Sequence, residues 1–89
     1  MQRTKIIATE VAMPTTSGAA SSISEATCVR LYNGSGAAAT VSLSPSVGSA
    51  TTSTFTMATG SVEFLEKYST DVIFASSASV LASKVGLTN

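Results

Sequence analysis

The stretch ATCVRLYNGSGAAATVSLS, residues 26–44, decides the fold class of this 89-residue chain. Apolar and polar residues alternate in two runs that are separated by a run of Gly, Ser and Ala. Successive side chains of an extended strand point to opposite faces, so Val29 and Leu31 share one face, and Val41 and Leu43 likewise share one. This alternation is typical of β-strands with one buried face. The stretch therefore predicts two strands of an all-β domain.

The same alternation continues along the chain. Phe55 and Met57 are two residues apart, as are Val62 and Phe64, and we expect all four pairs to form the core. The expected strands cover residues 26–33, 38–44, 53–58, 62–67, 71–75 and 80–87. In the last of these, three apolar residues share a face: Leu81, Val85 and Leu87. Six to seven short strands at this spacing predict a small antiparallel β-sandwich or barrel.

The pair Asn33-Gly34 lies between the first two expected strands. Both residue types tolerate positive φ, which the tight type I′ turn requires at its two central positions. The pair therefore predicts that the runs 26–33 and 38–44 form an antiparallel hairpin.

The first 25 residues differ from the rest of the chain. A strand over residues 4–13 is expected to end at Pro14, and its β-branched residues favour strand, although a helix over the first ten residues stays open. Residues 15–24 are rich in Ser and have the composition of a flexible loop. We therefore divide the chain into an N-terminal strand or arm with a flexible loop, residues 1–25, and a β-sandwich domain, residues 26–89.

Composition limits the partners that this chain can have. Five basic and five acidic residues balance, whereas 16 Ser and 13 Thr supply most of the polarity. No basic cluster favours nucleic acid or anionic lipid, and no apolar run is long enough for an export signal or a membrane span, so we expect neither nucleic-acid nor membrane binding. A short, nearly neutral chain with one Cys gains stability most readily by oligomerisation.

Residue chemistry predicts no catalytic residue, no cofactor-binding residue and no metal site. Glu63, Glu66 and Asp71 are close in sequence, but the first two project to opposite faces of a strand and Lys67 adjoins them, so a solvated strand end is the favoured interpretation. A Ser–Lys pair that uses Lys67 or Lys84 stays open, although nothing supports it.

Three further patterns have structural interpretations. Asn33-Gly34-Ser35 fits a turn better than a glycosylation site, because we expect no export signal. It also fits a turn better than a phosphate site, because a following helix and a nearby Lys are absent from the sequence around it. The threonines of residues 51–56 fit the outer face of one strand. Cys28 should lie opposite the face of the buried residues of its strand, as a small structural or interfacial residue rather than a reactive thiol.

Two motifs carry a resemblance to a known family. A strand VRLYNG at residues 29–34 is followed by FTM at 55–57, by VEFLEKYSTDVI at 62–73 and by VLA at 80–82. This order resembles small β-sandwich virion proteins of tailed bacteriophages, in which a V-R-hydrophobic-x-N strand precedes a hydrophobic-E-K-x-x-T-D corner. The similarity covers about two thirds of the chain, from residue 26 onward, and the corner over residues 66–71 is its most specific part.

The resemblance implies a non-enzymatic capsid decoration or cement protein. Such a subunit binds the major capsid protein and copies of itself, often as a trimer, on the capsid surface after synthesis in the bacterial cytoplasm. The N-terminal arm would lie along the shell or add a strand to a neighbour. A neck or tail accessory protein of the same particle and a cytoplasmic small-ligand-binding β module remain the alternatives.

Overall fold

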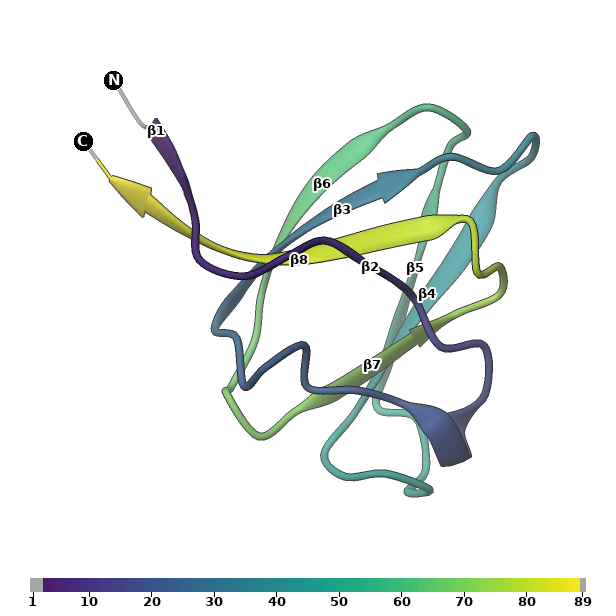
Figure 1. The fold of residues 1–89 in the computed structure, drawn as a ribbon. Coiled ribbons are helices and arrows are strands. Elements are labelled where there is room, and N and C mark those ends of the chain that lie inside the picture. The colour runs from purple at the N-terminus through teal and green to yellow at the C-terminus, as the bar shows by residue number, and fades with distance from the viewer. Residues whose placement is uncertain (1–2, 89) are drawn as a thin grey trace.

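Two antiparallel sheets pack face to face in the computed structural model, which describes residues 3–88 and the side chains of residues 3–86 (Figure 1). The larger sheet has the strand order β1-β8-β3-β6, with β2 also paired with β8, and the smaller has the order β5-β4-β7. The elements are β1 (Arg3–Ile6), β2 (Val11–Ala12), the 3-10 helix η1 (Ser17–Ala19), β3 (Cys28–Asn33), β4 (Ala39–Ser44), β5 (Ser53–Met57), β6 (Val62–Glu66), β7 (Val72–Ala75) and β8 (Val80–Thr88). The predicted small antiparallel β-sandwich is confirmed.

The core fills the space between the two sheets. Its buried side chains come from both sheets and from the N-terminal segment: Met13, Ile23, Ala26, Val29, Leu31, Ala39, Val41, Met57, Ile73, Ala75, Val80 and Ala82. Leu43 and Phe55 are partly buried against this cluster. Three of the four predicted core pairs are therefore confirmed. Each fully buried aliphatic side chain stabilises the fold by roughly 1.5–3 kcal/mol.

The fourth core pair, Val62 and Phe64, is wrong. These side chains are 41% and 47% exposed. Strand β6 is the outermost strand of the larger sheet, and Glu63 lies opposite the buried Leu31. This register turns Glu63 and Leu65 toward the smaller sheet and turns Val62 and Phe64 outward, because residues opposite each other across a ladder share a face.

The predicted hairpin at Asn33-Gly34 is also wrong. Strand β3 pairs with β6 and β8, whereas β4 pairs with β5 and β7, so the connection crosses from one sheet to the other. Neither Asn33 nor Gly34 has a positive φ. The buried Asn33 amide instead donates to the carbonyl oxygens of Ala37 and Met57, both at 3.0 Å, and its Oδ1 accepts the Ser35 N–H at 3.0 Å. These bonds hold the chain in an inter-sheet crossing rather than a type I′ turn.

The predicted strand over residues 4–13 is present as two short strands along one edge of β8 (Figure 1). Strand β1 pairs with residues 85–88 and β2 with residues 81–82. Between them, the N–H groups of Ile7 and Ala8 both donate to the Lys84 carbonyl oxygen, at 3.0 and 3.3 Å. The ladder is interrupted at this point, as in a bulged strand.

The segment between β2 and β3 packs against the sandwich, although its composition predicts a flexible loop. Met13, Ala20 and Ile23 are buried, so part of the expected N-terminal arm belongs to the domain. Ile23, Ser24 and Glu25 have φ values of 54°, 57° and 58° and form a left-handed turn. Residues 1 and 2 of the expected arm lie outside the described residues.

Strand β8 faces the core with Val80 and Ala82 rather than with Leu81. Leu81 is partly buried and lies opposite Tyr32, on the outer face of the larger sheet. Val85 is buried but is not part of the core cluster, and the side chain of Leu87 lies outside the described residues.

Candidate interaction face and the adjoining corner

Four large apolar side chains on three neighbouring strands lie close together on the outer face of the larger sheet, among the described residues. Tyr32 of β3 lies opposite Val62 of β6 on one side and Leu81 of β8 on the other, and Phe64 is two residues from Val62 on the same face. We call Tyr32, Leu81, Val62 and Phe64 the outer apolar strip. Opposed side chains in antiparallel strands are about 4.5–5.5 Å apart at Cβ, so the strip is continuous across the sheet. Exposed apolar side chains that gather on one face make this strip a candidate interaction site.

Charged groups adjoin the outer apolar strip on one side. Arg30, which lies opposite Phe64, forms an ion pair with Glu10 at 3.4 Å. Both side chains are more than one third exposed, so the pair stabilises the fold by at most about 1 kcal/mol. The pair ties β3 to the bulged segment between β1 and β2 and gives the strip a polar rim.

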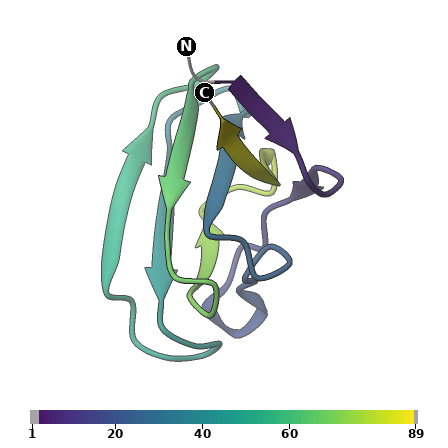
Figure 2. The same ribbon diagram turned by 90° about the vertical axis from the view of Figure 1, so that its left-hand side faces the viewer.

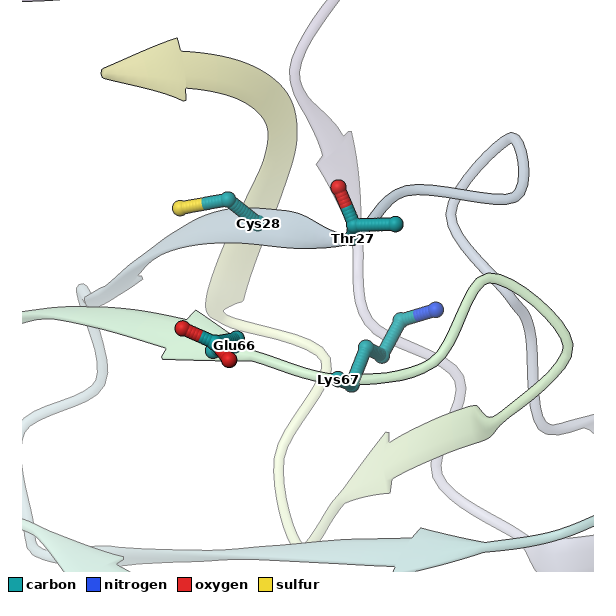
Figure 3. A pocket seen from close by; sticks show the side chains of 4 residues that line it. All are labelled: Thr27, Cys28, Glu66 and Lys67. Atoms are coloured by element: carbon teal, nitrogen blue, oxygen red, sulfur yellow. The ribbon is translucent and has the colours of Figure 1, made fainter.

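Cys28 is the first residue of β3 and lies on the outer face next to the strip. It lies opposite Glu66, and Figure 3 shows both side chains pointing to the same side of the sheet. Burial raises the pKa of the Cys28 thiol, and the neighbouring Glu66 carboxylate raises this pKa further. The thiol therefore stays protonated near neutral pH, which favours the structural interpretation of this residue. Its predicted position, opposite the face of Val29 and Leu31, is confirmed.

The corner over residues 66–71 is built around a buried ammonium group. Lys67 is 7% exposed, and its Nζ donates to the carbonyl oxygens of Tyr68 at 3.2 Å and Asp71 at 2.8 Å. Its side chain extends away from Glu66 toward the corner loop (Figure 3). Burial lowers the pKa of Lys67, the Asp71 charge opposes this shift, and the Lys84 charge adds to it. Glu63 and Glu66 are exposed, as the predicted solvated strand end requires, whereas the adjoining Lys67 is buried and closes the corner.

Two open depressions adjoin this corner. One, of about 470 Å³, is lined by Thr27, Cys28, Glu66 and Lys67, and the other, of about 320 Å³, by Leu43, Glu66, Lys67, Tyr68 and Asp71. Glu63 and Glu66 point to opposite faces of β6, as predicted, so the structure does not bring them together. Both Lys67 and Lys84 donate to main-chain carbonyl oxygens, Lys84 to that of Ser24 at 2.9 Å. Glu66 and Lys67 line both depressions, and Asp71 adds a second carboxylate to the smaller one.

The other residues singled out from the sequence lie in the core or on the surface of the sandwich. Asn33 is 0% exposed, and its amide hydrogens are bonded to main-chain carbonyl oxygens in the inter-sheet crossing rather than in the predicted turn. Thr54 and Thr56 lie exposed on the outer face of β5, as expected. Within residues 3–88, no three acidic, Cys or His side chains gather where they could hold one metal ion. The described part of the chain also contains no helix long and apolar enough to cross a membrane.

The outer apolar strip was missed by sequence reasoning because Val62 and Phe64 were assigned to the core and Leu81 to one apolar face with Val85 and Leu87. The alternation contains a signal for it: Cys28, Arg30 and Tyr32 are two residues apart from one another in turn, so the Tyr32 side chain lies on the polar face of β3. No protein-family model, curated protein or solved structure matches this chain.

Proposed function

We propose that this chain is a non-enzymatic structural subunit of a tailed-phage virion, a capsid decoration subunit that binds the major capsid protein and copies of itself on the capsid surface. One observation carries this proposal: Val62 and Phe64 of the outer apolar strip are 41% and 47% exposed on the larger sheet, beside the partly buried Tyr32 and Leu81. The motifs at residues 29–34 and 62–73 support the choice of particle, because they resemble those of small virion proteins.

The strip has the chemistry of a protein-binding surface. Phe64 and Tyr32 provide aromatic area, and aromatic side chains supply much of the binding energy at protein interfaces. The chain has a net charge of zero, so long-range electrostatic attraction contributes little to the encounter. A partner that fits presents an apolar, weakly charged surface patch.

Many copies on one particle strengthen such contacts. A strip of four side chains covers less than the roughly 1,000 Å² of a stable interface, so one copy binds weakly. Binding to a lattice of repeated sites, together with contacts between neighbouring copies, raises the overall affinity through effective concentration.

The first test is mass spectrometry of purified virions from the phage that carries this coding sequence. Capsids stripped of the chain are then incubated with recombinant protein and sedimented. Val62→Ser combined with Phe64→Ser should reduce the bound fraction at least tenfold, because it removes the exposed centre of the strip. Val47→Ser is the matched control, since Val47 is 55% exposed on the loop between β4 and β5 and lies outside the strip.

Abundant chain in virions and strip-dependent binding to capsids support the proposal. Absence of the chain from virions would overturn it in favour of the cytoplasmic ligand-binding module. Presence in virions without binding to capsids would instead favour the neck or tail accessory protein, and cryo-electron microscopy of the particle would then locate it.

A further inference from the structure

The two sheets have four lateral edges, and an unpaired edge presents N–H and C=O groups that can bind another strand. The edge of β7 is closed by the chain itself. Ser21 and Ile73 exchange two main-chain hydrogen bonds, of 3.1 and 2.8 Å, and the Ala75 N–H donates to the Pro14 carbonyl oxygen at 2.9 Å. This edge has no room for an additional strand.

Both edges of the larger sheet carry features that oppose pairing. On one side, β2 is two residues long, and β1 carries Arg3 and Lys5. On the other side, β6 points the charged Glu63 inward, opposite Leu31. Short edge strands and charges on an edge, inward-pointing ones included, are devices by which natural sheets prevent edge-to-edge association.

Strand β5 is the edge that lacks these devices. Its sequence STFTM contains no charge, no Pro and no Gly, and it pairs with β4 over five consecutive residues without a bulge. Its other edge pairs with no strand within residues 3–88. In Figure 2, β5 is the teal-green strand at the left-hand margin of the molecule, so its edge is accessible.

We propose that β5 pairs antiparallel with β5 of a second copy of this chain, about a two-fold axis at Phe55. In this register Phe55 lies opposite its own copy, Thr54 opposite Thr56, and Ser53 opposite Met57. The pleats then match: both threonines stay on the outer face, and the partly buried Phe55 rings cover each other at the core edge. The two small sheets become one six-stranded sheet.

A second copy fits this edge because the strand is complementary to itself. Thr–Thr pairs are favourable across antiparallel strands, and no like charges face each other in this register. A net charge of zero also removes repulsion between two copies. The inference deepens the self-association within the proposed function and rests on that part of it alone. Two-fold pairing closes as a dimer, so a trimer would require a further surface.

Sedimentation equilibrium of the full chain between about 10 μM and 1 mM tests the pairing, because a five-residue ladder gives an interface well below the roughly 1,000 Å² of a stable complex. The weight-average mass should rise toward twice the 8.9 kDa of the chain. Thr54→Lys with Thr56→Lys places lysines opposite each other and should leave a monomer. Thr40→Lys adds a charge to the same outer face on β4 and should associate like the wild type.

A mixture of two oppositely charged variants tests the pairing directly. The Thr54→Glu and Thr56→Glu double variant should be monomeric alone and should form a heterodimer with the lysine variant. Circular dichroism checks that each variant is folded, and concentration-dependent hydrogen-exchange protection of β5 amides in the wild type provides a readout without mutation. A wild type that stays monomeric at 1 mM, or a lysine variant that associates as the wild type does, overturns the pairing. Strip-dependent capsid binding by such a monomer would leave the proposed function standing.

Discussion

Replacement of Asn33 by Asp tests the crossing between the sheets, because it changes the chemistry of a buried group without changing its shape. The Asn33 Nδ2 donates to the carbonyl oxygens of Ala37 and Met57, and Oδ1 accepts from the main-chain N–H and the hydroxyl of Ser35. Asp keeps the accepting oxygen. It replaces the Nδ2 amide group, which donates two hydrogen bonds, with a second oxygen that faces the carbonyl oxygens of Ala37 and Met57.

The expected loss of stability is large. Removal of a partner from a buried hydrogen bond costs about 1–3 kcal/mol, and Met57 O is bonded in a fully buried setting. With the second, part-buried bond and the buried charge, we expect Asn33→Asp to destabilise the fold by about 3–5 kcal/mol at pH 7. A domain of this size has a total stability of roughly 4–13 kcal/mol, so the variant should lose a large share of it.

The loss should depend on pH. When protonated, the carboxyl group that Asn33→Asp introduces can donate to one of the two carbonyl oxygens, so its folded-state pKa should lie above the unfolded value of about 3.9. The folded variant then holds its proton to higher pH than the unfolded chain. Its stability relative to the wild type is therefore greatest at low pH and falls as the pH rises from the unfolded toward the folded pKa.

Urea unfolding of both proteins, followed by circular dichroism at pH 4 and pH 7, measures this difference. Thr51→Asp is the matched control, because it adds a carboxylate at an exposed position of the loop between β4 and β5. The reasoning is refuted if Asn33→Asp is as stable as the wild type at pH 7, or if its deficit is no larger at pH 7 than at pH 4.

Three further predictions concern single side chains. Ser24→Gly should stabilise the fold by about 0.5–1 kcal/mol, because Ser24 has a φ of 57° that costs an L-residue more than glycine; a lower midpoint in urea would contradict this. Ser44→Ala should raise the melting temperature, since the buried Ser44 Oγ has no hydrogen-bond partner among the described residues and its removal relieves about 1 kcal/mol; a decrease would reveal a partner. Between pH 8 and about 10, the stability of the wild type should rise relative to Lys67→Met, because the folded-state pKa of Lys67 lies below its unfolded value and the unfolded chain keeps its proton to higher pH; a constant difference in urea unfolding would argue against a buried ammonium.

Much of the strand pattern could be predicted because alternation is a local signal. The observed strands from β3 to β8 begin and end within two residues of the predicted ones. On β6, the local sequence could not show which set of alternating side chains faces the core. Glu63 and Phe64 are neighbours and point to opposite faces, and only the pairing of Glu63 with Leu31 decides which of them points inward. Long-range register therefore determined the side chains that form the outer apolar strip.

The pairing of strands was harder to predict than their positions. Asn33-Gly34 has the composition of a tight turn, but the Asn33 amide binds Met57, 24 residues away. Similarly, the Ser-rich segment over residues 15–24 lacks alternation, yet it buries Ala20, and Ile23 next to its end enters the core. The buried position of Lys67 gave no sequence signal, because its partners are main-chain carbonyl oxygens, which every residue possesses.

The tight hold on Asn33 also bears on how this protein ages. An Asn that precedes Gly loses ammonia readily when the following main-chain nitrogen attacks its side-chain carbonyl carbon, and hydrolysis of the resulting cyclic imide by water leaves Asp or its isomer. In the fold, the Gly34 N–H is bonded to the Ser79 carbonyl oxygen at 3.0 Å and the Asn33 amide is fixed on its own partners. Intact sandwiches should therefore keep their original residue over long storage, whereas any copy that opens at this crossing is exposed to irreversible chemical damage.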